Sequence, residues 1–106
     1  MPFWYFFTIP QLPPDVLHLP DQIQLRQYLC AEGDSVEPGT PIAIIENHYA
    51  VMRLKANGNG ILQKMLFRPN TYVNVGDPIA TIGADGEAIP YGQPRSILEI
   101  IERKHR

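Results

Sequence analysis

Cysteine is almost absent from this chain of 106 residues, which contains only Cys30. A single cysteine excludes an internal disulfide, and no cysteine, histidine and aspartate spacing in the sequence resembles a metal site. Cys30 follows Tyr28-Leu29 in a predicted strand, where a thiol behaves as a small apolar side chain. We therefore expect Cys30 to fill the core, with oxidation chemistry as the less favoured alternative.

The sequence also lacks an excess of charge of one sign, because 9 Lys and Arg face 11 Asp and Glu for a net charge of -2. No global basic field exists to attract nucleic acid or anionic lipid. The apolar start MPFWYFFTIP has no cationic residue or cleavage site and is far shorter than the roughly 20 residues of a membrane span. We expect a cytoplasmic protein without a nucleic-acid or membrane partner.

Catalytic motifs are missing as well. No Gly-x-Ser-x-Gly segment occurs, and no serine or cysteine is paired with an evident base. The glycine-rich turn at 57–60 precedes a predicted strand, whereas phosphate-binding loops precede a helix. We predict that the protein is not an enzyme and has no catalytic or metal-binding residues.

An internal repeat is the strongest pattern that is present. Residues 25–45 recur as residues 62–82 at an offset of 37, with eight of 21 positions identical and no gap. The identical pairs are Leu25/Leu62, Leu29/Leu66, Val36/Val73, Gly39/Gly76, Pro41/Pro78, Ile42/Ile79, Ala43/Ala80 and Ile45/Ile82. Two copies are too few for a solenoid, so one domain of two similar halves is predicted.

The turns of the two halves also correspond. Gly33 in the first copy matches Asn70 in the second, and these residue types most readily accept positive φ. Gly39 and Gly76 each stand two residues before a proline, which can start a strand without donating a hydrogen bond. Each half should run strand, turn, short extended segment, turn, strand.

A hairpin lies between the halves. Residues 42–62, IAIIENHYAVMRLKANGNGIL, read as a strand, a reversal at Asn47-His48, and a returning strand that alternates from Ala50 to Lys55.

This hairpin resembles the segment of lipoyl and biotinyl carrier domains that bears the prosthetic group. Glu46 matches the acidic residue before the attachment site, Ala50 matches the small residue after it, and GDSVEPG resembles the family's Gly-Asp-x-Val-x-x-Gly. The resemblance covers residues 17–82, and we assign residues 17–86 to this domain. It implies an all-β flattened barrel, or barrel-sandwich hybrid, of two four-stranded sheets with Asn47, His48 and Tyr49 exposed at one end.

The departure from the family is at the attachment position, where Tyr49 replaces lysine. A phenol with a reference pKa near 10 does not replace an amine in forming the family's amide with lipoate or biotin. The resemblance therefore implies a protein-interaction or scaffold module with no cofactor, and neither Glu46, Asn47 nor His48 is expected to bind one.

Two other functions stay open. One is a lipoyl or biotinyl carrier modified at another lysine, such as Lys55, and serving a larger acyl- or carboxyl-transfer complex. The other is a small-ligand binder that uses the hairpin tip or the aromatic N-terminus.

Apolar segments flank the resemblance. In the N-terminal extension, residues 1–16, the run FWYFFTI predicts a strand that covers either this domain's own core or another subunit. We favour a homodimer through this segment, because two-fold dimers are the commonest assemblies.

The tail, residues 87–106, predicts a short helix. Ser96 and Glu99 have capping-box spacing, the pairs Glu99/Arg103 and Glu102/Arg106 are four apart, and Ile97, Leu98 and Ile101 share a helical face.

Overall fold

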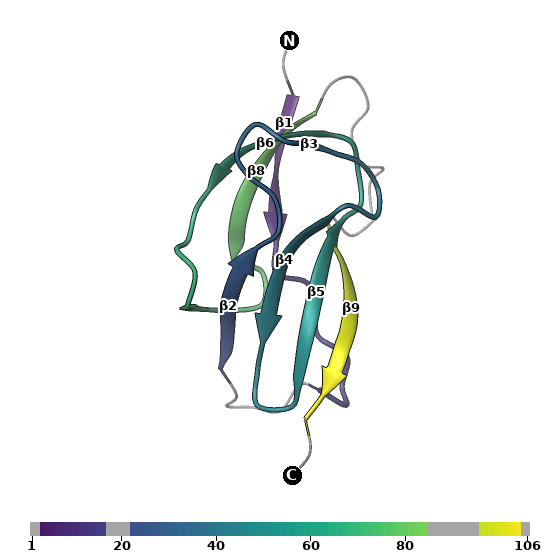
Figure 1. Ribbon diagram of the computed structural model, residues 1–106, viewed down its shortest axis with the longest axis vertical. Coiled ribbons are helices and arrows are strands. Elements are labelled where there is room, and N and C mark those ends of the chain that lie inside the picture. The colour runs from purple at the N-terminus through teal and green to yellow at the C-terminus, as the bar shows by residue number, and fades with distance from the viewer. Residues whose placement is uncertain (1–2, 17–21, 85–95, 105–106) are drawn as a thin grey trace.

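The computed structural model describes residues 3–16, 22–84 and 96–104, and every regular element in these ranges is a β-strand (Figure 1). The strands are β1 (Phe3–Thr8), β2 (Ile23–Tyr28), β3 (Ser35–Val36), β4 (Pro41–Glu46), β5 (Ala50–Ala56), β6 (Gly60–Met65), β7 (Thr71–Val73), β8 (Pro78–Ala84) and β9 (Ser96–Arg103). No helix in the described ranges is long and apolar enough to span a bilayer. The predicted domain boundaries at 16/17 and 86/87 involve residues outside the described ranges.

The strands form two sheets, which confirms the all-β prediction. The prediction of two four-stranded sheets is wrong, because β9 pairs with β5 and gives the second sheet five strands. One sheet has the order β1-β8-β6-β3, and the other has the order β7-β2-β4-β5-β9. The repeat explains this arrangement, because β2, β3 and β4 of the first copy correspond to β6, β7 and β8 of the second. Strand β2 pairs with β4 and β7, and β6 pairs with β8 and β3, so each half contributes to both sheets.

The turns obey the same quasi-twofold relation. Gly33 has φ 98° and Asn70 has φ 69°, as their shared position in the repeat predicts. The Gly33 N–H donates to the Leu62 carbonyl at 2.7 Å, and the Asn70 N–H donates to the Leu25 carbonyl at 2.6 Å. Each half therefore anchors its first turn on the first strand of the other half.

Strand β1 belongs to this two-sheet unit. It pairs with β8 as β5 pairs with β4, and Gly76 donates to the carbonyl of Ile9 just as Gly39 donates to that of Ala56. Its side chains alternate, with Tyr5 and Phe7 buried in the core. Of the two predicted locations for this strand, the structure therefore shows it covering the domain's own core.

The opposite side of β1 is exposed. Trp4 is 53% exposed and Phe6 is 38% exposed, and their rings meet edge to face with centroids 5.0 Å apart. Both aromatic rings thus remain available to a partner.

The core lies between the two sheets and draws on strands of both. Its largest fully buried side chains are Phe7, Ile9, Leu12, Val16, Leu25, Ile42, Ile45, Met52, Leu54, Leu62, Ile79 and Ile82. Gly60 lets β6 cross close to β8, because a Cβ there would lie 2.4 Å from the Gly83 carbonyl oxygen. A glycine is therefore required by packing at this end of the Asn57–Gly60 turn.

The predicted C-terminal helix is wrong, because residues 96–103 form strand β9 against β5. Leu98 and Ile100 face the core as neighbours on one side of the strand, while Ile97 and Ile101 are exposed. The register shifts between Val51 and Met52, so Ile101 lies at a bulge. Burial of Leu98 and Ile100 against β5 stabilises the strand more than the helical spacing of the tail stabilises a helix. Arg106, of the predicted helical pair Glu102/Arg106, lies outside the described residues.

Candidate functional site at the hairpin tip

The hairpin of β4 and β5 projects its tip from the same end of the molecule at which β9 finishes (Figure 1). Strand β5 alternates strictly between buried and half-buried side chains, so the hairpin is part of the core along its whole length. Glu46 pairs with Val51 at its last rung, and residues 47–49 make the reversal.

Asn47 is the structural centre of the tip. Its side chain is buried, and its Oδ1 accepts the N–H groups of Tyr49 at 2.8 Å and of Ala50 at 2.9 Å. Its Nδ2 donates to the carbonyl of Val16 at 2.6 Å. The prediction of an exposed Asn47 is wrong, because the amide both shapes the turn and fastens the tip to the N-terminal segment.

Tyr49 and His48 differ in exposure. His48 is exposed as predicted. The prediction of an exposed Tyr49 is wrong, because its side chain is half-buried and packs against the hydrophobic core. The two rings meet edge to face at a centroid distance of 5.3 Å. The Tyr49 carbonyl accepts the backbone N–H of Lys104 at 2.8 Å, so the position that resembles an attachment site is held by the C-terminal strand.

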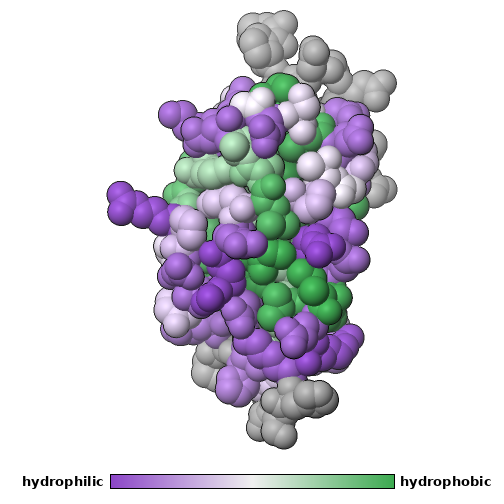
Figure 2. Space-filling view, viewed as in Figure 1, coloured by the Kyte–Doolittle hydropathy of each residue, from purple (hydrophilic) through white to green (hydrophobic). Residues whose placement is uncertain are grey.

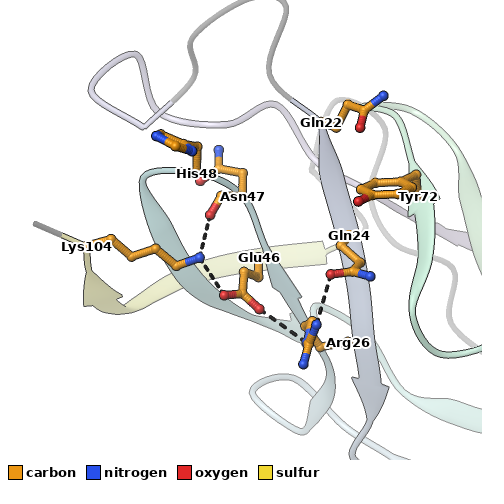
Figure 3. A pocket seen from close by; sticks show the side chains of 8 residues that line it. All are labelled: Gln22, Gln24, Arg26, Glu46, Asn47, His48, Tyr72 and Lys104. Atoms are coloured by element: carbon orange, nitrogen blue, oxygen red, sulfur yellow. Dashed lines mark hydrogen bonds and ion pairs between the residues drawn. The ribbon is translucent and has the colours of Figure 1, made fainter. Parts of the chain in front are cut away.

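Glu46 connects three strands through its carboxylate. Its Oε1 lies 3.2 Å from Arg26 Nε, and its Oε2 lies 2.5 Å from Lys104 Nζ (Figure 3). Lys104 Nζ also donates to the Asn47 carbonyl at 2.8 Å. Arg26, Glu46 and Lys104 thus form a charge cluster at the tip.

An open polar depression of about 460 Å³ lies beside the charge cluster. Its lining residues lie on β2, β4 and β7, at the tip, or directly before β2 and after β9. They are Gln22, Gln24, Arg26, Glu46, Asn47, His48, Tyr72 and Lys104 (Figure 3).

The remaining candidate lysines lie away from the tip. Lys55 is at the far end of β5, opposite Pro41, and its Nζ lies 3.3 Å from Glu99 Oε1. Lys64 is exposed on β6 in the other sheet. Lys104 is therefore the candidate lysine whose amine the structure brings to the tip.

The structure places no ligand set for a metal in its described ranges, where no three His, Cys, Asp or Glu side chains gather. Cys30 is half-buried, and its burial, with a smaller contribution from the charge of Asp34, raises the pKa of the thiol. A raised pKa leaves less of the reactive thiolate at neutral pH.

The sequence carries a local signal for the structural role of Asn47 at the tip but none for the role of Lys104. The buried role of Asn47 has a local signal, since asparagine commonly bonds the backbone two residues on in turns. Lys104 has no such signal, because its approach to Glu46 depends on β9 pairing with β5, whose paired residues lie 40 or more positions apart in the sequence.

Comparison with known proteins gives the chain a family. The family model described as "Biotin-requiring enzyme", for biotinyl and lipoyl domains, matches residues 15–82. The chain belongs to the biotinyl/lipoyl domain family. The matched range contains the hairpin and both copies of the internal repeat.

Curated relatives of this biotinyl/lipoyl domain are much longer proteins. The pyruvate dehydrogenase E1 component subunit beta of Rhizobium meliloti (strain 1021) is 37% identical over 81 residues, which are 76% of this chain and 17% of that protein. The dihydrolipoyllysine-residue acetyltransferase component of the pyruvate dehydrogenase complex of Rickettsia felis (strain ATCC VR-1525 / URRWXCal2) is 41% identical over 64 residues, or 59% of this chain and 16% of that protein. The component of the same name in Rhizobium meliloti is 34% identical over 83 residues, which are 77% of this chain and 18% of that protein.

The chain thus spans about a sixth of the length of the relatives it matches. Members of the family carry lipoate or biotin covalently, and in those proteins the biotinyl/lipoyl domain is a carrier rather than a catalyst. The activities in the names of these relatives are therefore those of much longer proteins.

Proposed function

We propose that this biotinyl/lipoyl domain is not acylated at its hairpin and acts by protein contact, as a non-catalytic interaction or scaffold module. The observation that carries the proposal is Tyr49 at the attachment-like position, half-buried and packed against the core. A phenol cannot form the stable amide of a lysine carrier. The relatives named as components of a pyruvate dehydrogenase complex support a role within a protein assembly.

The geometry of the tip supports the same proposal. Here the Tyr49 N–H is bonded to Asn47 and its carbonyl is bonded to Lys104. The tip is thus fixed from two sides, which suits a rigid contact surface.

We propose a second copy of the chain as one partner, with Trp4 and Phe6 in the contact. These rings are exposed on a strand whose opposite side buries Tyr5 and Phe7, and neither Trp4 nor Phe6 is part of the domain's own core. Aromatic residues are enriched in protein interfaces, and two-fold dimers are the commonest assemblies.

A carrier modified at a different lysine is the second candidate function, and one observation favours it. The amine of Lys104 lies at the tip, 2.8 Å from the Asn47 carbonyl oxygen, whereas Lys55 lies at the other end of β5. If the chain is a carrier after all, Lys104 is better placed than Lys55 to bear lipoate or biotin.

Intact mass spectrometry tests the choice between the two functions. The protein is co-expressed with a lipoate ligase and, separately, with a biotin ligase, as the wild type and as Tyr49→Phe, Lys55→Arg and Lys104→Arg. We expect the unmodified mass throughout. An added lipoyl or biotinyl group that disappears only with Lys104→Arg or only with Lys55→Arg would establish the carrier function and identify its lysine.

A further inference from the structure

The polar depression beside the hairpin tip has a surplus of positive charge and of hydrogen-bond donors. Within the charge cluster, two cations share one carboxylate, so the formal charge is one positive unit on a chain whose net charge is -2. The Arg26 side chain is 46% exposed and the Lys104 side chain is 33% exposed, so both cations remain accessible from solvent.

The donor count of Arg26 exceeds the bonds it makes within the described ranges. A guanidinium carries five N–H donors in a planar fork and cannot lose its charge. Arg26 uses Nε toward Glu46 and Nη1 toward the Gln24 side chain at 2.9 Å. A further acceptor can therefore bind beside Glu46 without displacing it.

Tyr72 supplies an aromatic wall to the same depression. It lies opposite Gln24 in the register of β7 and β2, and it is 59% exposed. Its ring stands between Gln22 and Gln24 on the side of the depression away from Lys104 (Figure 3). A tyrosine exposed to this extent costs little entropy to bury and is typical of protein interfaces.

The charge balance selects the chemistry of the ligand. A single carboxylate matches the one surplus positive charge, and arginine binds carboxylates through two parallel N–H bonds. A phosphate dianion fits less well, because its second negative charge exceeds the one surplus positive charge of the cluster and is repelled by the Glu46 carboxylate. The depression is thus suited to a carboxylate attached to a group that can cover the Tyr72 ring.

We propose that this depression binds an acidic segment of a partner protein, with a Glu or Asp side chain on Arg26 and Lys104 and an apolar neighbour on Tyr72. This inference rests on the proposed protein-contact function and names the chemistry of its partner. Figure 2 shows that the face viewed there has an apolar band bordered by hydrophilic side chains, a pattern common in protein contact surfaces.

The test is a titration of the ¹⁵N-labelled full chain with the peptide acetyl-Gly-Glu-Leu-Gly-amide, in which binding is followed by the shifts of backbone amide signals. The matched peptide acetyl-Gly-Gln-Leu-Gly-amide removes the carboxylate, and free glutarate supplies carboxylates without a peptide. Arg26→Gln and Tyr72→Ala alter the depression. Arg53→Gln is the matched control, because Arg53 lies in the same sheet and bonds Glu99 at 2.9 Å outside the depression.

We expect the acidic peptide to shift the amides of the depression and to bind about tenfold more tightly than the Gln peptide or glutarate, with Arg26→Gln weakening it at least about fivefold. Arg53→Gln should change its affinity less than about twofold. Absence of local shifts, an equal loss with Arg53→Gln, or equally tight glutarate binding would each overturn the proposal. None of these outcomes bears on acylation, so the failure of this inference is distinguishable from that of the proposed function.

Discussion

At the scale of single residues, Asn47 is more deeply buried than either of its neighbours at the hairpin tip, Glu46 and His48. It makes three side-chain bonds from a buried position, whereas His48 is exposed beside it. The hairpin and its length could be predicted from the alternation of apolar residues around Asn47-His48. The burial of Asn47 could not, because it depends on contact with Val16, which lies 31 residues earlier.

We predict that Asn47→Ala lowers the free energy of unfolding by about 1–3 kcal/mol, because it leaves buried backbone groups without their partners. His48→Ala is the matched control and should change stability by less than about 0.5 kcal/mol. Urea unfolding followed by circular dichroism measures both. Equal stability of the two variants would mean that Asn47 does not hold the tip.

Tyr49→Lys should fold, since a lysine can lay its aliphatic stem over the surface now covered by the ring and place its amine in water. Loss of aromatic packing should lower stability by about 1 kcal/mol. The same unfolding measurement applies. A variant without β-sheet signal would show that the ring of Tyr49 is essential to the core.

The thiol of Cys30 should react slowly. Burial and the charge of Asp34 raise its pKa, so the thiolate fraction at pH 8 is lower than in a free thiol. Alkylation by iodoacetamide should therefore be slower than that of glutathione and should become faster as the pH rises. Asp34→Asn should speed the reaction modestly. A wild-type rate equal to that of glutathione would show that burial and Asp34 do not raise the pKa of the Cys30 thiol.

At the scale of elements, the internal repeat explains most of the fold. It predicted the positive φ of Gly33 and Asn70 and the quasi-twofold pairing of the sheets. The repeat did not extend to the flanks, where β1 takes the place equivalent to β5 and β9 extends one sheet. The tail spacing fitted a helix locally, but the pairing partner of β9 is β5, which local periodicity cannot reveal.

The strand assignment of the tail makes a prediction that separates it from a helix. Leu98→Ala and Ile100→Ala should each cost about 1–2 kcal/mol, since both side chains pack against the core. Ile97→Ala and Ile101→Ala should be nearly neutral, because both side chains are exposed. In a helix with Ile97, Leu98 and Ile101 on its buried face, the costs would instead fall on those three positions.

At the scale of the whole molecule, the two surfaces that we propose for partners, within the described ranges, are the aromatic pair on β1 and the polar depression beside the tip. They lie on different sheets, so a homodimer through the first leaves the second available.

The homodimer predicts twice the monomer mass in light scattering at high micromolar concentration. Trp4→Ser combined with Phe6→Ser should shift the protein toward monomer while leaving the core intact, because both side chains point outward. Ile97→Ser provides an exposed apolar control on the other sheet. A wild-type monomer at these concentrations would refute the dimer, and a dimer that survives the double substitution would move its interface elsewhere.

The central claim is that a biotinyl/lipoyl fold with Tyr49 at its hairpin works without a covalent cofactor. The most direct measurement is the intact mass of the full chain after co-expression with lipoate ligase and biotin ligase, beside a lysine-bearing lipoyl domain that is modified in the same cells. The account predicts the mass of the unmodified chain while that control domain gains its cofactor. A chain that gains one lipoyl or biotinyl group under the same conditions would contradict it.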